Sequence, residues 1–330
     1  MDAAGAHEIG DLLEDERLPA VSVAAMHHSA MVWMAAFGYA DRVSRLQATP
    51  QTRFRVASIS KPLASAALGL LVERGQLDLD APVRELVPEY PDQGHPITAR
   101  QLAAHLSGIP HYGEGDLVNR IHYRDVIHAL DKFKDRPLLS VPGERFSYSS
   151  FGWNLLGAVI QRAAGTDFLE YMHREVFEPA GMAHTEADRT EVPTPQGARF
   201  YEIQPDGAVV DAPAVDNSDL WAAGGFLSTA EDLVRFGDAL LAGSLLLPST
   251  VDILWDIQKT ASGEDTGYGL GWRWSLLEGH REVGHDGSHV GCTGRLMIFP
   301  DDDLVLAMLT NANSQKLSAT MERIALLILN

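Results

Sequence analysis

Cysteine is almost absent from this sequence of 330 residues, and basic residues are outnumbered. The single cysteine, Cys292, excludes an intrachain disulfide framework and fits a reducing compartment. The 26 lysines and arginines face 45 aspartates and glutamates, which gives a net charge of −19. Because binding of a polyanion depends on clustered positive charge, we expect no nucleic-acid partner.

Long apolar runs are also missing. No run approaches about 18 residues, so we expect no membrane-spanning helix and no membrane insertion. The N-terminal stretch MDAAGAHEIGDLLEDERLPA is acidic and lacks a basic segment followed by an apolar one, so it is not a signal peptide. The sequence therefore predicts a cytoplasmic protein, or one exported after loss of a leader.

Strand-like patterns lie at both ends of the chain. Ala20–Met26 and Met31–Gly38 read as a hairpin, and Arg295–Phe299 and Leu304–Thr310 flank a turn of proline and aspartates. Between them, residues 58–247 are mostly helices and loops. This order predicts an α+β fold (an α/β sandwich), in which one antiparallel sheet from the two termini is flanked by helices and carries an inserted helical lobe.

The expected organisation is one catalytic domain covering residues 1–330. Its sheet lobe is expected at about 1–57 and 248–330, and its helical lobe at about 58–247. The proline-rich stretches read as loops inside this unit. Helices are predicted over residues 7–17, from Ser58 to about Gly75, over Phe151–Gly165, from a capping box at Ser228–Glu231 to about Ala242, and over Ser314–Leu329.

The most informative local feature is Ser58-Ile59-Ser60-Lys61, at the start of an apolar helix-like run. A spacing of three residues puts the hydroxyl and the amine one helical turn apart on the same face. Lysine accepts the hydroxyl proton only if its ammonium is destabilised, and apolar surroundings have that effect. On the motif alone, a helix cap at Ser58 with a solvated Lys61 remains an equal alternative.

Two further segments carry candidate chemistry. Tyr148, in Tyr148-Ser149-Ser150, is a candidate general base, because a phenol near an ammonium has its pKa lowered. The alternative is a boundary tyrosine that packs its ring. In His285-Asp286-Gly287-Ser288, a polar side chain followed by glycine at a strand end allows close approach of a substrate, and the next N–H can donate to an oxyanion. The alternative is a glycine-rich loop.

Together, these segments resemble the serine β-lactamase and penicillin-binding protein superfamily. The similarity is closest to its class C-like branch, with D-alanyl-D-alanine carboxypeptidases and related esterases, and above all to its mitochondrial serine β-lactamase-like members. It runs from about Leu18 to Ile328. It includes VASISKPLASAALGLLVERGQLDLDAPV, HLSGIPHY, PGERFSYSSFGWNLLG, VDNSDLWAAGGFLSTAEDLVRFG and GHDG.

The resemblance implies a role for each matching residue. Ser58 is the expected acylated nucleophile, Lys61 its proton partner, and Tyr148 the base for Ser58 and then for the deacylating water. The backbone N–H groups of Ser58 and Ser288 are the expected oxyanion hole. Ser150, His285, Asp286 and Gly287 are the expected substrate-binding residues. No cofactor and no metal is implied.

Two departures from the family pattern affect the substrate. Ser150 stands where the family often has asparagine, so its hydroxyl has shorter reach and fewer donors. His285-Asp286-Gly287 stands in place of Lys-Thr-Gly, which replaces a permanent cation with a mostly neutral group beside an acid. Binding of a substrate carboxylate is expected to weaken, with Arg295 as a candidate to supply the missing charge.

Other readings compete with this assignment. Lys259-Thr260-Ala261 resembles the third motif but lacks its glycine, and Cys292 is a rival nucleophile with His285 or His289. His95, His105 and His111 are irregularly spaced, which argues against a metal site. The resemblance places His105, in HLSGIP, in a structural loop near the cleft rim. The aromatic residues Trp221 and Tyr112 are candidate pocket residues or plain core.

The sequence thus predicts a serine hydrolase that forms an acyl-enzyme with a small-molecule or peptide substrate. Esterase or peptidase activity is favoured over efficient hydrolysis of β-lactams, because of the departures at Ser150 and His285. The alternative is a non-catalytic binding protein or filament-forming scaffold, since fold alone does not fix function. A pure scaffold has no chemical need for Ser58, Lys61 and Tyr148 together.

Overall fold

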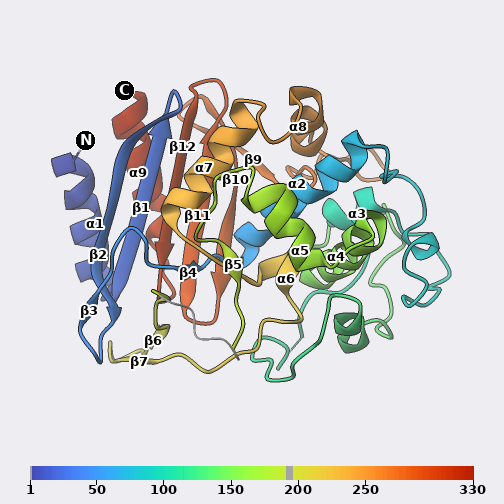
Figure 1. Cartoon of the computed structure of the whole chain (residues 1–330), viewed down its shortest axis with the longest axis horizontal. Helices are drawn as coiled ribbons and strands as arrows, with labels where there is room; N and C mark the ends of the chain where they lie inside the picture. The colour runs from blue at the N-terminus through green and yellow to red at the C-terminus, as the bar shows by residue number, and fades with distance from the viewer. Residues whose placement is uncertain (1, 114, 191–195) are drawn as a thin grey trace.

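The computed structural model describes residues 2–113, 115–190 and 196–330. A twisted antiparallel sheet lies on one side of the molecule, and a group of helices lies beside it (Figure 1). The two termini lie together, next to the outer face of the sheet. The predicted α+β architecture is therefore confirmed.

The main sheet has seven strands in the order β3-β2-β1-β12-β11-β10-β9. The N-terminal hairpin joins the C-terminal strands because β1 pairs antiparallel with β12, with Val21 opposite Thr310. The strands are β1 (Ala20–His27), β2 (Ala30–Asp41), β3 (Leu46–Gln47), β9 (Arg273–Leu277), β10 (His280–His289), β11 (Cys292–Phe299) and β12 (Leu304–Thr310).

The β1–β2 hairpin closes through a two-residue turn. His27 pairs with Ala30, and the intervening His28 and Ser29 have φ angles of 52° and 57°. Two consecutive positive φ angles are those of a type I′ turn, whose twist matches that of the flanking strands. The predicted hairpin is thus present, one to three residues longer at its ends.

Helices cover both faces of the sheet. On the outer face, α1 (Asp2–Glu16) and α9 (Leu317–Leu329) pack together, and their apolar side chains form a core with β1, β11 and β12. On the inner face, α7 (Ala230–Leu241) lies across β1 and β12. The structure thus puts α7 against the sheet, whereas the sequence-based division assigned residues 230–241 to the helical lobe.

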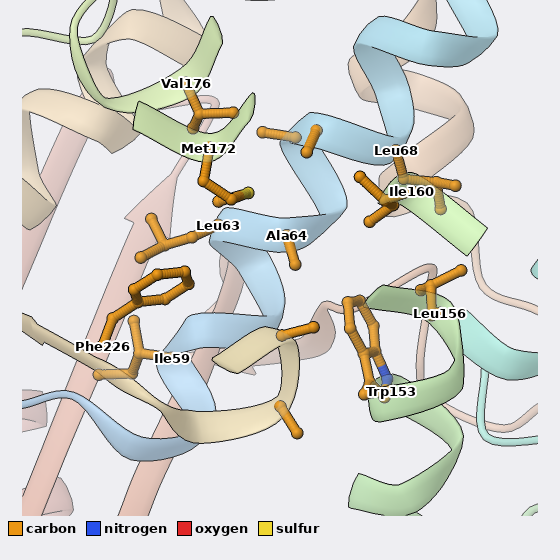
Figure 2. Close-up of a cluster of buried hydrophobic side chains, with 14 of the residues drawn as sticks. Ile59, Leu63, Ala64, Leu68, Trp153, Leu156, Ile160, Met172, Val176 and Phe226 are labelled. Carbon is orange, nitrogen blue, oxygen red and sulfur yellow. The ribbon is translucent and has the colours of Figure 1, made fainter. Parts of the chain in front are cut away.

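The helical part is built around α2 (Ser60–Glu73), which is buried along almost its whole length. Figure 2 shows Ala64 and Leu68 of α2 on the side of Trp153, Leu156 and Ile160 of α4. Leu63 lies on the other side of α2, next to Met172 and Phe226. The other helices are α3 (Ala99–Ala103), α4 (Ser150–Ala164), α5 (Phe168–Met172), α6 (Trp221–Gly224) and α8 (Pro248–Trp255), with the short turns η1 (Ala57–Ile59), η2 (Val83–Glu85), η3 (His128–Lys132) and η4 (His173–Phe177).

Several elements escape the sequence patterns. A small sheet orders β4 (Phe54–Arg55), β8 (Phe226–Ser228) and β5 (Glu186–Ala187), and β6 (Tyr201–Ile203) pairs with β7 (Val209–Asp211). The cap of α7 is also shifted by one residue. Thr229, and not Ser228, accepts a hydrogen bond from the backbone of Asp232. Within the described residues, no helix is both long and apolar enough to cross a bilayer.

Candidate active site

Ser58 lies in the short turn η1, between strand β4 and helix α2. The residue before it, Ala57, has a φ of 45°, which is uncommon for a residue with a side chain. Strand β10 approaches this turn closely at Gly287. A Cβ atom there would come within 2.2 Å of the carbonyl oxygen of Val56. Glycine at position 287 is therefore what lets β10 lie against the turn that carries Ser58.

Lys61 is fully buried one turn after Ser58. Its Nζ lies 3.1 Å from Ser58 Oγ and 3.3 Å from Ser150 Oγ, and it donates to the carbonyl oxygen of Ala223 at 2.7 Å. The amine is thus held between the first two motifs and helix α6. The alternative of a solvated Lys61 with Ser58 as a plain helix cap is wrong.

The environment of Lys61 disfavours its ammonium form. Burial lowers the pKa of Lys61 well below its ordinary value, and the nearby guanidinium of Arg273 lowers it further. No carboxylate contributes to its shift. A buried neutral amine 3.1 Å from a serine hydroxyl is a competent proton acceptor.

Tyr148 lies over the same pair, with Lys61 Nζ 4.9 Å from the centroid of its ring. Burial raises the pKa of Tyr148 to about 12, although the hydrogen bond to Ser58 and the charge of Arg273 act in the opposite direction. The expected lowering of this pKa by Lys61 is therefore wrong. It assumed a charged ammonium, whereas burial affects both groups and favours the neutral form of each.

Two histidines accept hydrogen bonds from the backbone of the Tyr148-Ser149-Ser150 segment. His105 Nδ1 accepts the backbone N–H of Ser149 at 3.0 Å, and His111 Nδ1 accepts that of Ser150 at 3.1 Å. Their rings also flank the phenol, with centroids 4.2 and 5.5 Å from that of Tyr148. Burial lowers the pKa of His111 to about 4 and the pKa of His105 well below its ordinary value. Both are therefore neutral acceptors at pH 7.

His285 lies inside strand β10, not at a strand end as expected, and the alternative of a glycine-rich loop is wrong. Nδ1 of His285 donates to the carbonyl oxygen of Asp286 at 2.6 Å. Because the ring proton is then on Nδ1, Nε2 accepts a hydrogen bond from the hydroxyl of Tyr268 at 2.8 Å. Burial lowers the pKa of His285 well below its ordinary value. His285 is thus a neutral side chain with both ring nitrogens occupied, and it does not replace the lysine cation of the family motif.

The cation beside the site is Arg273, and not Arg295. Arg295 is buried on β11, donates to Glu282 at 3.0 Å and Glu322 at 2.8 Å, and does not line the cavity described below. Arg273 lies at the end of β9, with its guanidinium 5.9 Å from the ring centroid of Tyr148. The expectation for Arg295 is therefore wrong, and sequence reasoning missed Arg273.

These side chains surround one cavity of about 260 Å³. Ser58 and Ser288, the two expected oxyanion-hole residues, both line it, while Lys61 lies buried behind its wall. Among the other lining residues are Tyr148, Ser150, His285, Asp286, Arg273, His111, Tyr112, Leu117 and Leu220. The wider hollow of about 530 Å³ between Pro82 and Ile97 contains no serine–lysine pair.

Comparison with known proteins identifies the family of this chain. The beta-lactamase family model matches residues 6–329, which is nearly the whole chain. The chain belongs to the beta-lactamase family. A curated relative of this family member is the mitochondrial serine beta-lactamase-like protein LACTB of Homo sapiens, 29% identical over 416 residues, covering 93% of this chain and 76% of the relative. The Bacillus subtilis protein described as putative penicillin-binding protein PbpX is 30% identical, and the match covers 72% of this chain and 57% of PbpX.

Solved structures place this family member in the same fold. The octameric penicillin-binding protein homologue from Pyrococcus abyssi has a TM-score of 0.86 and 28% identity, covering 100% of this chain and 78% of its own. The D-amino acid amidase from Ochrobactrum anthropi also has a TM-score of 0.86, covering 98% and 99%. Its 23% identity supports the fold alone. Family and relatives together support serine hydrolase activity in general.

The rival readings find no support in this family member. Lys259 pairs with Asp265 at 3.1 Å on the surface, and its motif does not line the cavity. Cys292 is fully buried, and burial raises the pKa of its thiol to about 12, which disfavours a thiolate. Tyr112 lines the cavity and Trp221 is core. Across the described parts of the chain, no three histidine, cysteine or acidic side chains are grouped to hold a metal ion.

Proposed function

We propose that this protein is a serine hydrolase that acts through an acyl-enzyme on a small ester or amide substrate. The observation that carries the proposal is the buried Lys61 amine, 3.1 Å from Ser58 Oγ, with a pKa well below its ordinary value. A nucleophilic serine needs an adjacent proton acceptor that is neutral at working pH. Lys61 meets both requirements.

The hydrogen bonds around Lys61 support the direction of proton transfer. A neutral lysine has two N–H groups and one lone pair. The N–H groups have acceptors in Ala223 O at 2.7 Å and Ser150 Oγ at 3.3 Å, which leaves the lone pair for the hydroxyl of Ser58. In acylation, Ser58 Oγ attacks the carbonyl carbon and its proton passes to Lys61. The backbone N–H groups of Ser58 and Ser288 then stabilise the oxyanion.

Tyr148 is assigned the complementary role of proton donor. With a pKa of about 12, only about one phenol in 10⁵ is ionised at pH 7, so a phenolate base is disfavoured. Its hydroxyl, in hydrogen-bond contact with Ser58, instead gives a proton to the leaving group, and the Lys61 ammonium restores it. In deacylation, water attacks the acyl carbon and gives its proton to Lys61. The Lys61 ammonium then gives a proton to Ser58 Oγ as the bond from Oγ to the acyl carbon breaks, which restores the hydroxyl and the neutral amine.

The finer substrate preference is for esters or peptides over β-lactams. Ser150 offers a hydroxyl where the family pattern has a longer amide, and its oxygen is already engaged by Lys61. His285 contributes no positive charge. A non-catalytic scaffold remains the rival function, but it gives no reason to bury a neutral lysine against a serine.

The proposal is tested with a panel of p-nitrophenyl esters, chromogenic peptides and nitrocefin. We expect ester or peptide turnover by the wild type, slower nitrocefin turnover, and loss of activity in Ser58→Ala. The matched control is Ser60→Ala, because the buried Ser60 hydroxyl accepts the backbone N–H of Phe226 and does not line the cavity. Activity that survives in Ser58→Ala refutes the nucleophile. Complete inactivity of the wild type, with no labelling of Ser58, favours the scaffold.

A further inference from the structure

The rim of the cavity carries two opposite charges, Arg273 and Asp286. Arg273 pairs with Gly284 across the β9–β10 ladder, and Asp286 lies two residues further along β10. The two are therefore diagonal neighbours on the same face of the sheet. Nε of Arg273 is 4.0 Å from Oδ2 of Asp286, and the side chains are 51% and 52% exposed. The cation that faces the site thus has a fixed counter-charge beside it.

The positive charges near Asp286 and Arg273 are already paired with carboxylates. Arg295 lies opposite Asp286 on β11, with its Nε 3.5 Å from Oδ1. Its other nitrogens are taken by Glu282 and Glu322. The group therefore contains two guanidiniums and three carboxylates. The net charge of this group is negative.

A substrate carboxylate meets an obstacle in this arrangement. To reach Arg273, the substrate carboxylate must displace the carboxylate of Asp286 or lie beside it, and two negative charges so close together repel each other. Asp286 also cannot donate a hydrogen bond when ionised, unlike the threonine of the family pattern. A neutral ester or amide meets neither difficulty.

We propose that Asp286 is a specificity-determining residue that makes the site reject acyl groups carrying a carboxylate near the scissile bond. The substrate class is then a neutral ester or amide. This inference rests on the proposed function, because it concerns the same cavity. It assigns to Asp286 a selective role that its neighbour Gly287, which only allows close approach, does not have.

The test compares two esters of equal acyl length, p-nitrophenyl butyrate and mono-p-nitrophenyl succinate. The readout is the ratio of kcat/KM for the anionic ester to that for the neutral ester. We expect this ratio to rise at least tenfold in Asp286→Asn. In the wild type, the discrimination should also weaken as salt increases, because both side chains are half exposed.

The matched control is Asp301→Asn, which removes the same charge from an exposed turn, where Asp301 pairs with Arg281. Its ratio should equal that of the wild type. An equal rise in both variants shows a net-charge effect and overturns the proposal, as does an unchanged ratio in Asp286→Asn. Asp286→Thr provides a second variant if the first fails to fold.

Failure of the proposed function gives a different result. If wild type hydrolyses neither ester, that function is refuted, and the selectivity is decided by calorimetric binding of benzamide and benzoate. Wild type should bind the neutral benzamide more tightly, and Asp286→Asn should gain affinity for benzoate. Absence of that gain overturns the role of Asp286.

Discussion

The neutral state of Lys61 can be measured through the stability of the protein. Replacing Lys61 by methionine keeps most of the volume of the side chain and removes its titration. In the unfolded chain, a lysine is protonated up to a pKa of about 10.4. In the folded protein, burial lowers this pKa well below its ordinary value. Between the two values, the unfolded state binds more protons, so the free energy of unfolding of the wild type rises with pH.

The size of this effect follows from the proton count. One proton of difference corresponds to about 1.4 kcal/mol per pH unit. If Lys61 is neutral throughout the range from pH 7 to pH 10, the wild type should gain about 4 kcal/mol relative to Lys61→Met. The absolute stability at one pH decides less, because the variant also leaves the carbonyl of Ala223 without its donor, a loss of about 1–3 kcal/mol.

The assay is urea unfolding of both proteins at several values between pH 7 and pH 10. All other titrating groups are common to the two proteins, so the difference between the curves isolates Lys61. We expect the wild-type advantage to grow with pH, while Lys61→Met loses about 10²-fold or more in kcat/KM for an ester. Parallel stability profiles would show that Lys61 is protonated when folded, which would refute its role as the base.

Three further predictions concern the groups around Lys61. Tyr148→Phe should lower kcat by about 10²-fold or more with little change in KM, and an effect confined to KM would contradict a role as proton donor. The wild-type rate should show no titration of Tyr148 below pH 10, since its pKa is about 12. Arg273→Gln should move the acidic limb of the kcat/KM profile for a neutral ester to higher pH, because removal of the positive charge raises the pKa of Lys61, and a shift to lower pH would contradict this. His111→Phe should lower kcat about tenfold, whereas His111→Asn, which keeps an acceptor for the N–H of Ser150, should retain most of it. Equal loss in both His111 variants would show that the ring, and not the acceptor, matters.

The sheet was predictable where strands are uniformly apolar. The runs that became β1, β2, β11 and β12 are long and uncharged over most of their length. Strand β10 was missed because His280–His289 mixes charged residues with two glycines, and it becomes a strand only between β9 and β11. Two-residue strands such as Phe54–Arg55 have no pattern at all.

The site was predictable where its residues are close in sequence. The spacing from Ser58 to Lys61 and the Tyr148 segment carry local signals. The contributions of Arg273, His105 and His111 arise from tertiary pairing alone, since no spacing links them to Ser58. The error on the pKa of Tyr148 has the same origin. Sequence suggests which charges are near, but burial decides which of them exist.

Intact-mass spectrometry can show whether Ser58 forms a covalent adduct, as an acyl-enzyme requires. The wild type is incubated with a p-nitrophenyl phosphonate ester, and the adduct is located by peptide mapping, with Ser58→Ala and Ser60→Ala treated in parallel. We expect a single phosphonyl adduct on Ser58 in the wild type and in Ser60→Ala, and none in Ser58→Ala. An adduct at another residue, or ester turnover by a protein that gives no adduct, would contradict it.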